Sequence, residues 1–199
     1  MNKLEKINKK LKELAELINA PEDKKVQLAE LEPGERFDTE LGKFIVLGHD
    51  NGVTKVIQDD FFKKGVEFDD ESCDYTKSDL KKMFDGEITE AYEKVFGDAL
   101  VEHEVDLKSV DMQDYGKFKC KARPMTFDEA REFNSLIVKK ELPDWWWLCT
   151  PWSTEERGWK YQVAVVAPSG RIDWGICGGG FGVRPFCILK SNIFVSKED

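Results

Sequence analysis

The stretch DWWWLCTPWSTEERGWKYQVAVVAPSGRIDWGICGGGFGVRPFCIL, residues 144–189, contains all six tryptophans of the chain and a triple glycine. Rigid, amphipathic rings at this density are expected in a core or on a binding face. Within the stretch, the apolar run 161–168, a Ser-Gly turn at 169–170 and the run 171–177 predict a β-hairpin. Residues 183–189 are predicted as a final strand. We therefore expect the rest of the chain to be a scaffold for this end.

The tryptophans are expected to divide between core and surface. Side chains alternate along a strand, so Trp145, Trp146 and Trp147 cannot all face one side, and we assign structural roles to Trp146 and Trp147. Polar residues or glycines surround the other three, which we expect to be partly exposed. Exposed tryptophan near arginine is typical of protein-binding hot spots. The predicted binding residues are Trp152, Arg157, Trp159, Arg171, Trp174 and Phe181, although a place in the core stays the alternative for any single ring.

The charge of the chain is negative and unevenly spread. The formal net charge is −9, which argues against direct nucleic-acid binding because that needs a basic surface. Residues 59–114 contain 18 acidic residues and 7 lysines, so the middle of the chain is its acidic part. The densest acidic group lies in the segment 61–75, which we expect to be a solvated loop, and consists of Asp69, Asp70, Glu71 and Asp74. Clustered oxygens suit a hard cation, but the segment lacks the pattern of an EF-hand.

No motif in the sequence indicates an enzyme. There is no Walker loop and no GxSxG elbow, and we predict neither catalysis nor a cofactor. The five cysteines lack CxxC spacing and are accompanied by only two histidines, which disfavours a disulfide framework and a zinc site. We expect buried, reduced thiols that are inert. His103 lies between two glutamates, from which we expect a raised pKa.

The N-terminal segment 1–22 is predicted to be an amphipathic helix. Its apolar positions follow the spacing of a heptad seam, and Pro21 ends it. The stripe either packs on its own domain or mediates self-association as a short coiled coil, and it consists of Leu4, Ile7, Leu11, Leu14 and Ile18. The segment lacks the apolar core of a signal peptide, and no run of the chain suits a membrane span. We therefore expect a cytosolic protein.

Local signals predict strands and helices between this segment and the tryptophans. Asp-Asn-Gly at 50–52 predicts a hairpin of strands 43–47 and 53–57. Short strands are expected within 101–110 and 118–122. Ser78 is a predicted N-cap of a helix closed by Gly86.

A second helix is predicted at 90–96. Thr126 and Glu129 form a predicted capping box at the start of a helix over 126–137.

Several motifs of the chain resemble a known but uncharacterised family. They are WWLCTP at 146–151, APSG at 167–170 and FGVRP at 181–185, preceded by LEPGERF at 31–37, FIVL at 44–47 and SDLKKMFDG at 78–86. In this order they resemble a domain family of bacteria and their phages whose signature runs WWLRSP, a VxxDG-type turn, then GVRPAL. Cys149 stands where that family usually has arginine, and Pro168-Ser169 where an acidic turn is common.

The resemblance implies a fold and a mobile-element origin, but no activity. The C-terminal motif is similar to the end of C-type-lectin-like folds, which include phage receptor-binding proteins and formylglycine-generating enzymes. Calcium-lectin signatures are absent, so calcium-dependent sugar binding is not implied. In such a family we expect Arg184 to be structural, with its guanidinium shared between backbone carbonyls or a carboxylate.

Together these observations predict an α+β, C-type-lectin-like domain at residues 26–197 after the N-terminal helix. We expect a non-enzymatic, phage-encoded or mobile-element-encoded module that binds a protein through its tryptophan- and glycine-rich loops. The alternative is an anti-CRISPR-like inhibitor of a bacterial defence nuclease. Its acidic segment would imitate nucleic acid in the basic channel of that nuclease.

Overall fold

The hairpin predicted from the tryptophan-rich stretch is present. In the computed structural model, which describes residues 25–198, strand β10 (Gln162–Val166) pairs antiparallel with β11 (Ile172–Ile176). They belong to a five-stranded sheet of order β11-β10-β9-β12-β5, completed by β9 (Trp146–Pro151), β12 (Phe181–Val183) and β5 (Lys63–Val66). The predicted helix 1–22, with its heptad stripe, lies outside the described residues.

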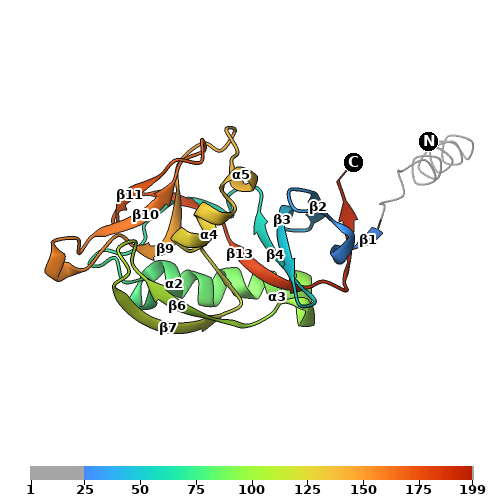
Figure 1. The fold of residues 1–199 in the computed structure, drawn as a ribbon, viewed down its shortest axis with the longest axis horizontal. Helices are drawn as coiled ribbons and strands as arrows, with labels where there is room; N and C mark the ends of the chain where they lie inside the picture. The colour runs from blue at the N-terminus through green and yellow to red at the C-terminus, as the bar shows by residue number, and fades with distance from the viewer. Residues whose placement is uncertain (1–24, 199) are drawn as a thin grey trace, which may run out of the picture.

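A seven-stranded sheet contains the first and last described strands. Its order is β1-β14-β2-β3-β4-β13-β8, and Figure 1 shows β1 and β14 at the end of the domain opposite β10 and β11. The bounds are β1 (Lys25–Gln27), β14 (Phe194–Lys197), β2 (Arg36–Thr39), β3 (Gly42–Asp50), β4 (Val53–Gln58), β13 (Phe186–Lys190) and β8 (Ala122–Arg123). A separate ribbon pairs β6 (His103–Lys108) with β7 (Asp114–Cys120).

The hairpin β3–β4 forms where Asn-Gly predicted it. Asn51 and Gly52 both have positive φ, of 46° and 81°, which is the backbone that a two-residue hairpin turn requires.

The central strands β9 and β10, and the middle of β3, are buried on both faces, which explains their continuous apolar sequences. Along β9, Trp147 belongs to one core cluster and Trp146 to the other, and both rings are fully buried. Residues of β3 and β10 alternate between the same two clusters. The rings of Trp146 and Trp147 therefore lie in different cores, so the three consecutive tryptophans do not share one side of the strand.

Helices cover the two core clusters from opposite sides. The first cluster lies against α2 (Asp79–Met83), a π-helical turn (Phe84–Ile88) and α3 (Thr89–Phe96). The second lies against α4 (Phe127–Glu132) and α5 (Asn134–Ile137), where the predicted capping box of Thr126 and Glu129 is present. Short 3-10 turns complete the helical part of the described chain at Leu28–Glu30, Tyr75–Lys77, Gly97–Ala99 and Glu155–Arg157. The domain is therefore of the α+β class.

Three local predictions are wrong. The helix from Ser78 does not end at Gly86, since the helical backbone continues through the π-helical turn directly into α3. The segment 183–189 is not one strand, since β12 and β13 belong to different sheets. Part of the expected loop 61–75 forms β5, whose residue Val66 pairs with Phe181.

The break between β12 and β13 is held by Arg184, which is fully buried. Its Nε donates to the Gln58 carbonyl at 2.8 Å and its Nη1 to the Ile137 carbonyl at 2.6 Å. Its Nη2 lies 3.7 Å from the Asp59 carboxylate. This arrangement matches the structural role expected for Arg184, because one guanidinium joins both sheets to the exit of α5.

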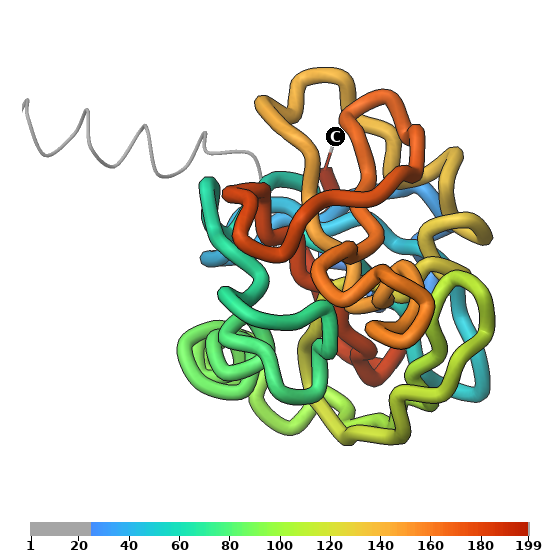
Figure 2. The backbone as a smooth tube through the Cα atoms, turned by 90° about the vertical axis from the view of Figure 1, so that its left-hand side faces the viewer, coloured from blue at the N-terminus to red at the C-terminus, as the bar shows by residue number. Residues whose placement is uncertain are grey.

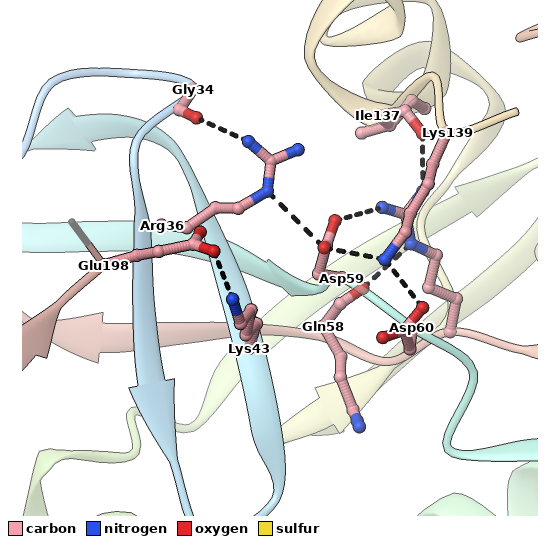
Figure 3. Close-up of polar contacts among 10 residues, drawn as sticks. Gly34, Arg36, Lys43, Gln58, Asp59, Asp60, Ile137, Lys139 and Glu198 are labelled. Carbon is pink, nitrogen blue, oxygen red and sulfur yellow. Dashed lines mark hydrogen bonds and ion pairs between the residues drawn. The ribbon is translucent and has the colours of Figure 1, made fainter. Parts of the chain in front are cut away.

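Two more cationic side chains lie close to the Asp59 carboxylate. Figure 3 shows Lys139 and Arg36 directed at its carboxylate, at 2.8 and 3.4 Å, and Lys139 also reaches Asp60. Asp59 and Arg184 are both buried, whereas Asp60 is largely exposed. The cluster is therefore an internal clamp between chain segments rather than an open site.

Candidate functional site

The three predicted binding tryptophans come together in space. The rings of Trp152 and Trp159 have centroids 6.5 Å apart, and those of Trp159 and Trp174 are 6.0 Å apart in an edge-to-face arrangement. Such pairs stabilise each other beyond the area they bury. We call these three rings the tryptophan ladder. It joins β11 to the loop 152–160, which protrudes at the left of Figure 1 and faces the viewer in Figure 2.

The outer end of the ladder is open to solvent. Trp174 is 41% exposed, and Ile176 two residues further along β11 is 56% exposed. Because side chains alternate along a strand, the two lie on one face, which we call the tryptophan face together with Trp159. The inner end is anchored, since Trp152 packs against the second core cluster. The partial exposure predicted for Trp152, Trp159 and Trp174 is therefore confirmed.

Strand β11 is an edge strand, and some of its backbone groups are already hydrogen-bonded within the chain. The Asp173 carboxylate accepts a hydrogen bond from the Trp174 backbone N–H at 2.9 Å, and Gly179 N–H donates to the Ile176 carbonyl at 2.7 Å. Side chains and local bonds that occupy an edge in this way oppose pairing with another strand. The apolar side chains of the tryptophan face are thus its main feature for binding.

Asp111 holds the tryptophan-bearing loop in place. One carboxylate oxygen accepts from the Ser109 hydroxyl at 2.6 Å, while the other accepts from the Ser153 hydroxyl at 2.7 Å and from Arg157 at 2.5 Å. Burial raises the pKa of Asp111, but the two hydroxyls and Arg157 outweigh it and lower the pKa to about 2. A backbone bond from Val110 N–H to the Pro151 carbonyl reinforces the contact. The loop is therefore preorganised.

The other predicted binding residues do not belong to the ladder. Arg157 is exposed but serves the contact with Asp111. Phe181 is half-buried and packs edge-on against the buried Trp147 ring, at 4.7 Å between centroids. Arg171 is exposed and lies over the Trp145 ring at 4.8 Å. These three residues thus support neighbouring structure, and only the tryptophans were placed together by the fold.

The acidic residues singled out from sequence divide into two kinds. Asp69 accepts hydrogen bonds from the backbone N–H groups of Glu71 and Ser72, and Asp74 caps the turn at Tyr75–Lys77. Asp70 and Glu71 are exposed. Half of the predicted acidic face therefore organises its own loop.

More carboxylates join this loop from distant parts of the chain. Two hollows of about 300 and 350 Å³ adjoin one another and share Ser72, Asp74 and Lys77 in their walls. Eight carboxylates and three lysines line them, and we call this surface the acidic basin. Its charged residues are Asp69, Asp70, Glu71, Asp74, Asp79, Asp114, Glu155, Glu156, Lys77, Lys82 and Lys160.

The thiols of the described chain and His103 are poorly suited to nucleophilic chemistry at neutral pH. All five cysteines are buried and free, and burial raises the pKa of Cys149 to about 12 and of Cys120 to about 11. The pKa of His103 is lowered to about 4, first by burial and then by the Arg123 guanidinium, so the expected rise is wrong. Glu129 and Glu102 act to raise this pKa, but burial and Arg123 outweigh them. The Cys120–His103 pair, 3.6 Å apart, is therefore a neutral thiol beside a neutral imidazole.

Arg123 itself is neutralised within the protein. Its guanidinium forms a two-pronged pair with Glu129, with both N–O distances at 2.6 Å, and its Nε donates to His103. The pair links β8 to the capping box of α4. The Arg123–Glu129 pair is buried and structural. The Arg123 guanidinium is therefore not free to bind an oxyanion.

Sequence reasoning missed several residues of this surface. Ile176 could have been found, because it follows Trp174 by two positions in the predicted hairpin. Glu155, Glu156 and Asp114 join the acidic basin only through the fold. Nothing in the sequence around Asp111 distinguishes it from the other acidic residues of the middle segment.

Residues 25–198 contain neither a metal-binding group of side chains nor a helix that could span a membrane. No three side chains among histidine, cysteine, aspartate and glutamate are grouped closely enough to hold a metal ion. In the same part of the chain, no helix has the length and apolar character needed to cross a membrane.

Comparison with known proteins gives one match. The family model described as "Domain of unknown function (DUF6273)" matches residues 74–191, which is more than half of the chain. The matched region includes the tryptophan ladder, Asp111, Arg184 and most of the acidic basin. Neither the curated proteins nor the solved structures gave a match. The chain belongs to the DUF6273 family, an uncharacterised domain family as the sequence motifs predicted.

Proposed function

We propose that the domain is a non-enzymatic module that binds a partner protein through the tryptophan face. The observation that carries this proposal is the ladder of Trp152, Trp159 and Trp174, anchored in the core at one end and open to solvent at the other. Tryptophans of this kind supply much of the binding energy in protein interfaces.

The surroundings of the ladder support binding rather than catalysis. Asp111 fixes the loop that bears Trp152 and Trp159, so little conformational entropy is lost when a partner binds. The nearby Cys73 is buried, and burial raises its pKa despite a hydrogen bond with Tyr115. A thiol in this state is a weak nucleophile at neutral pH.

The proposal is tested by affinity capture from bacterial lysate with Trp174→Ala as the key variant. Phe194→Ala is the matched control, because Phe194 is 65% exposed but lies on β14 at the other end of the domain. Loss of a hot-spot tryptophan costs about 2 kcal/mol of binding free energy, or about thirtyfold in affinity. A partner lost with Trp174→Ala and retained with Phe194→Ala supports the proposal. A partner retained by both variants contradicts it.

The acidic basin supports a second candidate, inhibition of a bacterial defence nuclease by imitation of nucleic acid. Its eight carboxylates against three lysines give a local charge of −5 that suits a basic channel. Capture at about 0.1 M and about 1 M salt separates the candidates, because salt screens charge but not apolar contact. A nuclease released at high salt and lost after charge reversal of Asp70 and Glu71 would favour this candidate.

We further propose that the fold is C-type-lectin-like, that the protein is cytoplasmic, and that a phage or mobile element encodes it. The support is the resemblance of the 146–151 and 181–185 motifs. An experimental structure with similarity to a C-type-lectin-like protein would test the first point. Fractionation of the producing cell would test the second, and the genes flanking the coding sequence would test the third.

A further inference from the structure

We propose that the partner segment bound by the tryptophan face is a basic, extended polypeptide, whose apolar side chains lie on Trp174 and Ile176 while its lysine or arginine side chains enter the acidic basin. This inference rests on the proposed function and specifies the chemistry of the partner. It joins two surfaces that the sequence suggested as alternatives into one binding site.

The two surfaces are continuous because one loop builds both. Trp159 belongs to the ladder, and the next residue, Lys160, lines the acidic basin. Glu155 and Glu156 of the same loop form the basin wall. Further backbone bonds tie the surfaces together, since Cys73 N–H donates to the Lys160 carbonyl at 2.8 Å. A ligand on the tryptophan face is therefore beside the basin.

Lys160 shows how the basin accommodates a cation. Its ammonium lies 3.4 Å from the Glu155 carboxylate and 5.5 Å from the centroid of the Tyr161 ring, which is itself 44% exposed. A lysine or arginine of a partner finds further carboxylates in the hollow that Lys160 lines.

Charge complementarity selects the class of ligand. The basin has a local charge of −5, on a chain whose formal net charge is −9, so phosphate-bearing ligands are repelled. The exposed surfaces of Trp174 and Ile176 are covered by large apolar side chains, which free cations lack. A polypeptide segment that carries both large apolar and basic residues close together in sequence satisfies both neighbouring surfaces at once.

The test is selection from a library of random displayed peptides against the full-length chain. Three variants are selected in parallel. Trp174→Ala removes the exposed ring, and Glu155→Lys/Glu156→Lys reverses two charges of the basin. Glu90→Lys/Glu132→Lys makes the same change in net charge on α3 and α4, where both residues are exposed.

The expected result is enrichment of peptides that combine lysine or arginine with tryptophan, phenylalanine, leucine or isoleucine. Their affinity falls about tenfold with Glu155→Lys/Glu156→Lys at low salt, and less than about twofold with the control pair. Trp174→Ala lowers it about thirtyfold at low and high salt alike.

Other outcomes separate failure of this inference from failure of the proposed function. Peptides that need Trp174 but carry no excess of basic residues overturn the inference and leave the proposed function standing. The inference is also overturned if the two charge-reversal pairs lower peptide affinity equally. The net charge of the chain, rather than the acidic basin, would then explain the preference for basic peptides.

If no peptide binds, or if binding ignores Trp174, both fail. A dimer in sedimentation that Trp174→Ala dissociates also overturns the inference, because a second copy would then cover the face.

Discussion

Replacement of Arg184 by alanine is expected to destabilise the fold more than any exposed substitution. The buried guanidinium of Arg184 donates hydrogen bonds to the Gln58 carbonyl and to the Ile137 carbonyl, with donor–acceptor distances of 2.8 and 2.6 Å. Arg184→Ala leaves both acceptors buried without this donor. Each orphaned group costs about 1–3 kcal/mol. Breaking a buried, paired charge typically costs about 3–5 kcal/mol in all, and we expect about 4 kcal/mol here.

The carbonyls, rather than Asp59, should account for most of this loss. Asp59 lies 3.7 Å from Arg184 Nη2, and it keeps Lys139 at 2.8 Å when Arg184 is removed. The coupling of Arg184 and Asp59 in a double-mutant cycle with Asp59→Asn should therefore stay below about 1 kcal/mol. Arg184→Lys keeps a charge but cannot reach both carbonyls, and should cost about 2 kcal/mol.

Urea unfolding followed by tryptophan fluorescence and circular dichroism measures these differences. Arg131→Ala is the control, because the Arg131 side chain is 64% exposed and its loss should change the free energy of unfolding by no more than about 0.5 kcal/mol. A free energy of unfolding for Arg184→Ala within about 1 kcal/mol of the unmodified protein would refute the reasoning. It would mean that water or a rearranged loop satisfies the two carbonyls.

Three further predictions concern packing, pH and thiol reactivity. A Cβ at Gly182 would lie 2.4 Å from the Phe61 ring, so Gly182→Ala should lower stability by about 1–3 kcal/mol, whereas Gly178→Ala, which meets no atom within 4 Å, should not. Because the pKa of Asp111 is lowered from 3.8 to about 2, its stabilisation is complete above about pH 4 and lost as pH falls through 2; the stability difference from Asp111→Asn should shrink over that range in acid titrations. The five buried thiols should react slowly with a disulfide reagent at pH 8 in the folded state and fully in urea; fast labelling of the folded chain would contradict the raised pKa values.

The parts of the fold that could be predicted are those that local chemistry determines. The β10–β11 hairpin follows from a turn between apolar runs, and the β3–β4 hairpin follows from Asn51-Gly52. The capping box at Thr126 needs only a residue three positions away. Each of these signals lies within a few residues of the structure it specifies.

Long-range pairing was not predictable in the same way. Strand β13 pairs with both β4 and β8, which lie far away in sequence, and the chain changes sheet at Arg184 between β12 and β13. An apolar run gives no signal for such a change. The acidic basin was underestimated for the same reason, because Asp114 and Glu155 reach it from separate segments.

The division of the tryptophans explains why the candidate site lies where it does. Both faces of β9 are covered, so Trp146 and Trp147 fill different cores. Trp152 follows β9 at the edge of the second core, and the Trp159 ring connects it to Trp174, which meets solvent. The exposed Trp174 ring is thus supported by ring contacts, through Trp159 and Trp152, that begin in the core. Binding energy gained at Trp174 is therefore not spent on ordering the loop, which is the property that a preorganised binding module requires.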